Sequence, residues 1–318
     1  MNARVVVFAY HNIGVRCLRV LLAYDADIAL VITHQDNPEE CIWFESVSAV
    51  AADYGLPVIT LSRPPERELI EIIRAIQPDF IFSFYYRHML PPELLVLAPQ
   101  GAFNLHGSLL PKYRGRAPIN WAVLNGETET GSTLHEMTSK PDAGAIVAKT
   151  LVPILPDDTA CQVFNKVTVS AEQTLWQAFP ALLADNAPRM PNDLSAGSYF
   201  SGRRPEDGRI DWSLPAQQVY NLVRSAAPPY PGAFTDVQGE RFIIASARLM
   251  KQGQNNTIKL PLGLQVFNYS ILGVCGDGRA IVIRELRHLN QSAPNSTSID
   301  RVIDMSTFLS LTQSLSRS

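Results

Sequence analysis

The chain has 318 residues, of which 46% are hydrophobic and 18% are charged, and its formal net charge at pH 7 is −3. This composition is typical of a globular protein with one to three domains, and it excludes a disordered or fibrous chain. Because the sequence lacks the basic excess that a nucleic-acid backbone attracts, we expect no nucleic-acid partner. It has no apolar run long enough to cross a bilayer, so we expect no membrane span.

The first half of the chain alternates apolar runs of strand length with amphipathic helical patterns. Strands are expected over 5–10, 28–33, 58–61, 80–84 and 102–105, and helices over 14–24, 46–54 and 66–76. Strands made almost entirely of Val, Ile, Leu and Phe indicate a mostly parallel sheet that helices cover on both faces. The pattern therefore predicts an α/β, Rossmann-like domain, to which we assign residues 1–190.

The pattern changes beyond residue 131. Two strands (132–137 and 145–152) are expected around a turn at 140–144, followed by a helix over 158–186 that Asp157 or Asp158 would cap. Residues 187–208 are rich in Pro, Asn, Ser and Gly, and we place a linker at 191–208.

The last third of the chain has the pattern of a small β domain. Expected strands cover 233–237, 242–249, 264–274 and 280–286, with a helix over 217–226. We assign residues 209–290 to a small β-barrel domain of OB-like type. Residues 291–318 form a polar tail that we expect to be partly ordered, with a weak helix over 299–315.

The four cysteines are widely spread and form no CxxC pair; they are Cys17, Cys41, Cys161 and Cys275. Such spacing fits neither a disulfide framework nor a zinc site. We therefore expect a cytoplasmic protein without a bound metal.

Chemistry-bearing residues gather where the strand over 102–105 ends. Asn104 and His106 lie two positions apart, so an extended chain would place them on one face. An amide can donate a hydrogen bond to an oxyanion, and an imidazole can exchange a proton near neutral pH. Asp142, in the following turn, could reach and orient the imidazole. Each residue also has a plainer interpretation, as a structural histidine or an ordinary turn aspartate.

The first strand-to-helix turn, residues 10–14, weakens one alternative function. It contains one glycine, where a dinucleotide-binding fingerprint needs three. A nicotinamide-dependent oxidoreductase is therefore poorly supported.

One combination of motifs favours catalysis. Asn-x-His-x-Ser-Leu-Leu-Pro-x-Tyr-Arg-Gly begins at Asn104, and Asp-Ala-Gly-Ala-Ile begins at Asp142. Together they resemble the formyltransferase family that uses 10-formyltetrahydrofolate. Over roughly residues 4–290, the chain is most similar to the branch that formylates UDP-4-amino-4-deoxy-L-arabinose in bifunctional polymyxin-resistance proteins. The stretches that carry this resemblance are residues 7–11, 33–38, 82–88, 104–118, 125–131, 202–204 and 231–234.

The resemblance implies a role for each residue that matches a family position. Asn104 and His106 would stabilise the oxyanion of the tetrahedral intermediate, His106 would protonate the departing folate nitrogen, and Asp142 would orient His106 and accept the proton of the attacking amine. The folate would contact His88, Met89, Leu90, Arg116, Thr138, Ser139, Lys140 and Pro141. The nucleotide-linked sugar would contact Tyr10, Arg203 and Arg204; Arg203 and Arg204 have a solvated linker as their alternative.

The resemblance also implies the reaction and its partners. The expected activity is formyl transfer from 10-formyltetrahydrofolate to UDP-4-amino-4-deoxy-L-arabinose, a step in lipid A modification. The alternatives are methionyl-tRNA formyltransferase, formylation of another nucleotide-linked amino sugar, and a nucleotide-binding module without catalysis. Relatives in this branch are usually fused to an NAD-dependent decarboxylase, and the sequence leaves open whether a separate decarboxylase is a partner of this chain. The sequence leaves the oligomeric state open.

Overall fold

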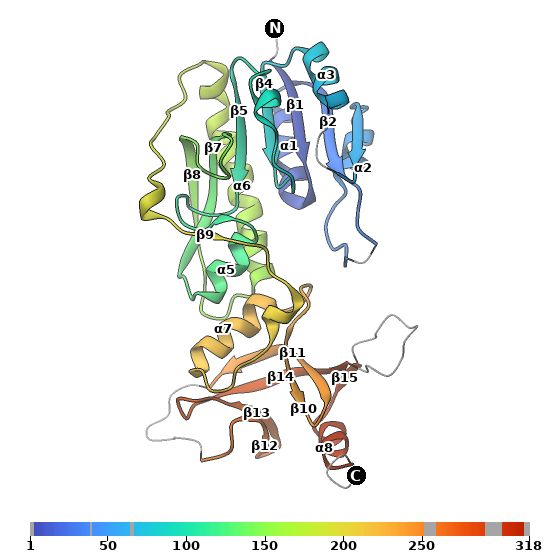
Figure 1. Cartoon of the computed structure of the whole chain (residues 1–318), viewed down its shortest axis with the longest axis vertical. Helices are drawn as coiled ribbons and strands as arrows, with labels where there is room; N and C mark the ends of the chain where they lie inside the picture. Colours follow the sequence, from blue (N-terminus) through green and yellow to red (C-terminus); the bar gives the residue numbers. More distant parts are fainter. Residues whose placement is uncertain (1–2, 39, 64–66, 251–258, 290–300, 315–318) are drawn as a thin grey trace. The chain divides into compact units, whose positions relative to one another are not determined.

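The computed structural model describes residues 3–38, 40–63, 67–250, 259–289 and 301–314. It divides into two compact units (Figure 1). The first comprises Met1–Ile119, Glu129–Pro153 and Phe164–Gly202, and the second comprises Asn120–Thr128, Ile154–Val163 and Arg203–Ser318. The second unit therefore includes two short segments that lie between parts of the first unit in the sequence.

A seven-stranded sheet with the order β3-β2-β1-β4-β5-β7-β8 forms the centre of the first unit. The strands are β1 (Arg4–Ala9), β2 (Asp27–His34), β3 (Val58–Leu61), β4 (Phe80–Phe84), β5 (Gly101–His106), β7 (Glu129–Glu136) and β8 (Ile146–Pro153). Strands β1 to β5 pair in parallel, whereas β7 and β8 run antiparallel to their neighbours. The expected α/β class with a mostly parallel sheet is confirmed.

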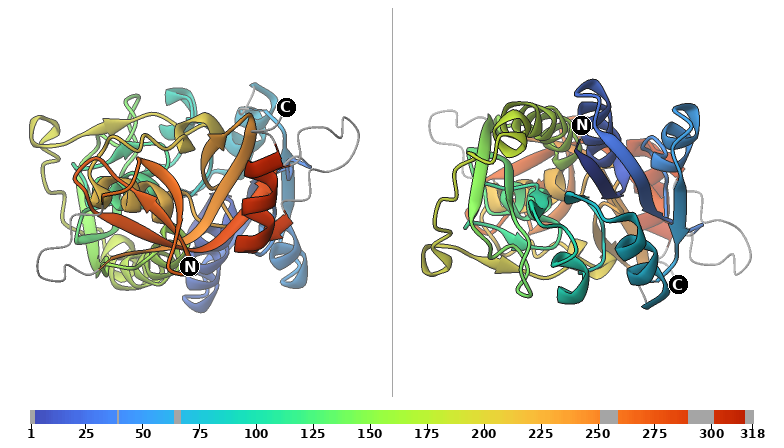
Figure 2. Two further views of the ribbon diagram at one scale, coloured as in Figure 1. Left: turned by 90° about the horizontal axis from the view of Figure 1, so that it is seen from below. Right: turned by 90° about the horizontal axis from the view of Figure 1, so that it is seen from above.

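Helices cover both faces of this sheet, as Figure 2 shows from two directions. They are α1 (His11–Ala23), α2 (Val47–Asp53), α3 (Arg67–Ile76), α4 (Pro92–Leu95) and α6 (Ala160–Leu183). The alternation of side chains along β4 divides the core. Phe80 and Phe82 contact Phe179 of α6, with ring centroids 6.3 and 5.9 Å apart. Ile81 joins the opposite cluster, which includes residues of α3 and α4. Burial on both faces explains why these strands are continuously apolar.

The stretch expected as a linker contains local structure. It holds the short helices η1 (Leu194–Ala196) and η2 (Pro205–Gly208), and strand β9 (Tyr199–Phe200) pairs in parallel with β6 (Arg114–Gly115). Gly115 has φ +96°, and a Cβ there would lie 2.2 Å from the carbonyl oxygen of Phe200. This close approach requires glycine, because any side chain would separate the two strands.

Helix α6 starts at Ala160, so the residue that caps it is Thr159 and not one of the two aspartates that we expected. The backbone N–H of Thr159 donates to Gln162 Oε1 at 2.8 Å, and the N–H of Gln162 donates to Thr159 Oγ1 at 3.3 Å. This reciprocal pair is a capping box. Asp158 instead accepts the backbone N–H of Leu155 at 2.7 Å, so the cap predicted at Asp157 or Asp158 was wrong.

The second unit is built on an antiparallel sheet with the order β10-β11-β14-β13-β12, and β15 pairs with β14. Its strands are β10 (Ala233–Val237), β11 (Glu240–Leu249), β12 (Gly263–Phe267), β13 (Ser270–Val274), β14 (Ala280–Leu289) and β15 (Arg301–Ile303). The other helices are α5 (Pro118–Leu124), α7 (Ala216–Ala226) and α8 (Met305–Ser314). Val219 and Val223 of α7 share a core with Phe242 and Ile244 of β11. This half-barrel confirms the expected small barrel-like β domain.

Two expectations for this unit change in detail. The run over 264–274, expected as one strand, is the hairpin of β12 and β13, because Asn268 and Tyr269 have φ values of 46° and 57°. Two successive residues with positive φ form the tight turn that joins antiparallel strands. In the predicted polar tail, β15 and α8 are ordered, while residues 291–300 and 315–318 lie outside the described residues.

Candidate active site

The end of β5 and the loop between β7 and β8 bring the three predicted functional side chains together. Asp142 Oδ1 lies 3.4 Å from His106 Nδ1 and 3.4 Å from Asn104 Nδ2. The other carboxylate oxygen accepts the backbone N–H of Gly115 at 2.8 Å, and the Asp142 carbonyl accepts the Asn192 amide at 3.0 Å. The loop is therefore fixed from two sides, with the Asp142 carboxylate facing the end of β5.

The Asp142 carboxylate is almost buried, with 11% of its side chain exposed. Burial on its own would raise the pKa of this carboxyl, but the charge of His106 and the hydrogen bond from the N–H of Gly115 hold its pKa well below the usual range. Asp142 is therefore an anion at neutral pH, beside the ring of His106.

The ring of His106 has an oxygen acceptor at each nitrogen. Nε2 donates to the carbonyl oxygen of Tyr113 at 2.7 Å, and Nδ1 faces Asp142. The two N–H groups of an imidazolium satisfy both acceptors. The arrangement can therefore hold a proton on His106 close to the Asp142 anion.

His135 completes the cluster and was not among the residues predicted from sequence. It lies on β7 directly opposite Asn104 of β5, and only 2% of its side chain is exposed. Its Nε2 is 3.1 Å from Asn104 Nδ2 and 3.4 Å from Asp142 Oδ1. The sequence shows a histidine within an expected strand. It does not show that this strand pairs with β5, which is what places His135 beside Asn104.

The residues predicted to contact folate lie on three separate segments. His88, Met89 and Leu90 follow β4, Arg116 follows β6, and residues 138–141 directly precede Asp142 in the β7–β8 connection. Burial is the largest cause that lowers the pKa of His88. The charge of Arg116 lowers it further, more than that of Arg87 does, so Arg116 lies near His88. Of the three residues after β4, Leu90 is buried, whereas Met89 is half exposed.

In the turn over 138–141, the Thr138 hydroxyl donates to the carbonyl oxygen of Lys140 at 3.0 Å. This bond stabilises the turn that leads into Asp142.

Tyr10 has its polar atom engaged within the protein. It is buried, its hydroxyl donates to Asp36 Oδ1 at 2.8 Å, and the guanidinium of Arg87 lies 4.8 Å from the centre of its ring. Burial and the bond to Asp36 raise the pKa of this hydroxyl. The structure thus gives Tyr10 a role in ordering the end of β1.

Arg203 and Arg204 belong to the second unit. Arg203 lies over the ring of Trp121 at 5.6 Å and donates to Ser225 Oγ at 3.0 Å. Arg204 is exposed, and its backbone N–H donates to Asp207 at 2.7 Å. Of the two guanidinium groups, that of Arg204 is the more accessible to solvent.

A further cluster lies at the end of β1, where the sheet order passes from β2 through β1 to β4. Open α/β sheets bind ligands at such a switch in strand order. His11 (φ 65°) stacks on Phe44 with ring centroids 3.8 Å apart and contacts Trp43 and Phe164. Burial, and secondarily the charge of Arg87, lowers the pKa of His11 to about 3. His11 is thus a neutral ring in an aromatic cluster.

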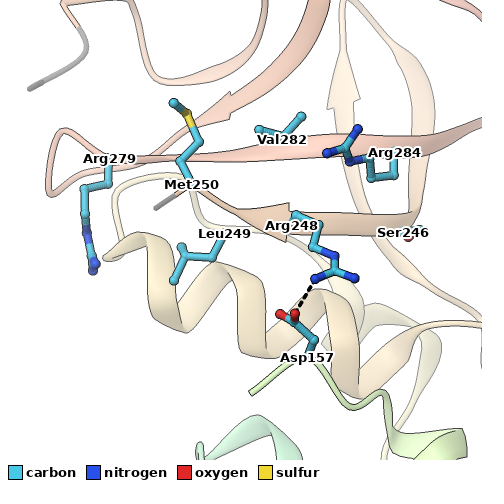
Figure 3. A pocket seen from close by; sticks show the side chains of 8 residues that line it. All are labelled: Asp157, Ser246, Arg248, Leu249, Met250, Arg279, Val282 and Arg284. Carbon is cyan, nitrogen blue, oxygen red and sulfur yellow. Dashed lines mark hydrogen bonds and ion pairs between the residues drawn. The ribbon is translucent and has the colours of Figure 1, made fainter. Parts of the chain in front are cut away.

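The second unit has a cavity of about 960 Å³, shown in Figure 3. It is lined by Asp157, Ser246, Arg248, Leu249, Met250, Arg279, Val282 and Arg284. Arg248 forms an ion pair with Asp157, and Arg279 forms one with Asp277 at 2.7 Å. The cavity therefore has a basic lining, in which two of the three arginines have carboxylate partners.

Within the described residues, two classes of feature were not found. The helices there lack the combination of length and apolar character that crossing a membrane requires. No group of three or more His, Cys, Asp or Glu side chains in that part of the chain is arranged to hold a metal ion.

An amide donor, an imidazole and a buried carboxylate are groups that acyl-type group transfer can use. Comparison with protein families gives the particular class. Residues 11–179 match the formyl transferase model, and residues 203–299 match the model of the formyl transferase C-terminal domain. The chain belongs to the formyl transferase family of enzymes.

Solved structures of low sequence identity share the fold. An N-formyltransferase from Helicobacter canadensis, in complex with folinic acid and dTDP-3-aminofucose, is 20% identical; the match covers 89% of this chain and 99% of that one, with a TM-score of 0.68. WlaRD, a sugar 3N-formyl transferase studied with dTDP and 5-N-formyl-THF, is 20% identical, with 92% and 99% covered and a TM-score of 0.70. HypX from Aquifex aeolicus, in complex with tetrahydrofolic acid, is 16% identical, with 97% and 47% covered and a TM-score of 0.63.

Proposed function

We propose that this protein transfers a formyl group from 10-formyltetrahydrofolate to the 4-amino group of a nucleotide-linked amino sugar, UDP-4-amino-4-deoxy-L-arabinose. The observation that carries the proposal is the convergence of Asn104, His106 and Asp142, with Asp142 Oδ1 lying 3.4 Å from a nitrogen of each of the other two side chains. Family membership and the folate and sugar-nucleotide ligands of the similar structures support the chemistry. The choice of UDP and of the arabinose rests on the sequence resemblance.

In the proposed reaction, the amine nitrogen forms a bond to the formyl carbon, and the carbonyl electron pair moves to the formyl oxygen, which gives a tetrahedral intermediate. When the intermediate collapses, the carbonyl forms again and the bond from that carbon to folate N10 breaks. Asn104 donates to the formyl oxygen as it becomes an oxyanion, and an electrostatic donor of this kind lowers the barrier by a few kcal/mol. Asp142 accepts the proton that the amine loses, and His106 gives a proton to N10. The products are the N-formyl sugar nucleotide and tetrahydrofolate.

The remaining assignments follow from the same proposal. The folate would bind against residues 88–90, Arg116 and residues 138–141, and the sugar nucleotide would use Tyr10, Arg203 and Arg204. We propose that the enzyme works in the cytoplasm.

The test is an acceptor panel with purified full-length protein and 10-formyltetrahydrofolate. The panel includes UDP-4-amino-4-deoxy-L-arabinose, dTDP-linked amino sugars and charged initiator tRNA, and mass spectrometry detects the 28-Da gain of a formyl group in place of hydrogen. The proposal predicts product with the UDP sugar. If only a dTDP-linked sugar is formylated, the assignment of a UDP-linked acceptor is wrong. If only the tRNA is formylated, the assignment of an amino-sugar acceptor is wrong.

A further inference from the structure

The tautomer of His135 can be deduced from its surroundings. Its Nδ1 lies 2.8 Å from the carbonyl oxygen of Glu136. Because a carbonyl oxygen only accepts, Nδ1 carries the hydrogen, and Nε2 of the neutral ring is an acceptor. This leaves a lone pair on Nε2 that points at the Asn104 amide, 3.1 Å away.

That lone pair determines which end of the Asn104 amide points inward. Only the NH2 group can donate to Nε2, so Nδ2 must face His135. The same Nδ2 lies 3.4 Å from Asp142 Oδ1, beyond the usual range of an N–H···O bond. One N–H of Asn104 is thus anchored, while the other makes only a weak contact that a stronger acceptor can replace.

We propose that His135 is a positioning residue that keeps the Asn104 amide oriented with an N–H available to the formyl oxygen. The inference rests on the proposed role of Asn104 in formyl transfer. An amide has nearly the same shape after a 180° flip, so packing alone does not select its orientation. Without the acceptor on His135, the flipped amide would present its oxygen to the developing oxyanion, and repulsion would replace donation.

Several charged groups surround His135. Asp142 faces it from the β7–β8 connection, and His106 of β5 lies on the other side of that carboxylate. On its own strand, the Glu136 side chain is paired with Arg189. A hydrogen on Nε2 would make it a donor toward Asp142 and would remove the acceptor for Asn104, so the proposed role requires the neutral ring.

Two substitutions separate positioning from packing. His135→Gln puts a carbonyl oxygen near the place of Nε2, whereas His135→Asn retains a polar atom near Nδ1 and is too short to reach Asn104. We expect His135→Asn to lower kcat by about 10²-fold, with KM for folate nearly unchanged. His135→Gln should retain kcat within about fivefold of the unsubstituted enzyme, because its carbonyl oxygen replaces the acceptor for Asn104. His288→Asn is the matched control, since His288 is bonded to Glu240 in the second unit; its kcat should not change.

A double-mutant cycle tests the partner. In an Asn104→Ala background, adding His135→Asn should have little further effect, because the amide that His135 orients is gone. The ¹⁵N chemical shifts of the His135 ring in the full chain provide a readout independent of activity, and they should report a hydrogen on Nδ1.

Three outcomes would overturn the inference: equal kcat losses for His135→Gln and His135→Asn, an undiminished His135→Asn effect in the Asn104→Ala background, or a hydrogen on Nε2 of the neutral ring. Each differs from failure of the proposed function itself. In that case the unsubstituted enzyme would formylate none of the acceptors.

Discussion

Replacing Asp142 by Asn removes the one carboxylate at the centre of the site and changes its shape very little. Asp142 Oδ1 lies 3.4 Å from Nδ1 of His106. At an effective dielectric constant near 20, an ion pair at this separation is worth up to about 5 kcal/mol. In the variant, solvent and the remaining dipoles replace part of the lost electrostatic stabilisation. We therefore expect Asp142→Asn to lower kcat by about 10²- to 10⁴-fold.

The assay is formyl transfer to the best acceptor of the panel, followed by mass spectrometry across pH 5–9. The matched control is Asp193→Asn, because Asp193 is a carboxylate of the same unit that accepts from Ser195; its kcat should stay within twofold of the unsubstituted enzyme. Circular dichroism and the melting temperature must show that both variants fold. A folded Asp142→Asn enzyme with kcat within threefold of the unsubstituted enzyme would refute the electrostatic argument.

Three further predictions concern stability. Gly115→Ala should lower the free energy of unfolding by about 1–3 kcal/mol in a urea titration, because its Cβ would meet the Phe200 carbonyl; an unchanged midpoint would contradict this close approach. His11 has its folded pKa lowered to about 3, so protons bind the unfolded chain first and stability falls as pH drops below the unfolded value. Between pH 7 and 5, the unsubstituted protein should lose about 2 kcal/mol more than His11→Asn, whereas parallel losses would show that His11 titrates normally. Thr159→Ala should cost about 1 kcal/mol by calorimetry, and a neutral result would remove Thr159 as the helix cap.

The sequence predicted the elements whose signals are local. Strands 58–61, 80–84 and 233–237 match β3, β4 and β10 residue for residue. Their apolar runs are short and bounded by turn residues, so periodicity and length define both ends. Where a boundary depends on one conformation, as at the turn of Asn268 and Tyr269, residue types alone did not reveal it.

For the candidate site, too, the sequence predicted some features and the tertiary fold determined the others. Asn104, His106 and Asp142 stand out in sequence only in combination, because two polar groups follow an apolar strand and both surrounding motifs resemble those of formyltransferases. Their 3.4 Å separations come from the tertiary fold, and so does the pairing of β6 with β9 that places Gly115 beside Asp142.

The sequence by itself determined the α/β class, the small β domain, the formyltransferase motifs and the three chemical groups of the site. Only the tertiary structure decided what surrounds them. His135 lies 31 residues beyond Asn104 and meets it because β7 pairs with β5 in one particular register. A shift of one residue would place His135 on the other face of the sheet. Strand periodicity shows that a side chain faces the core, but the pairing of distant strands decides which polar group it meets there.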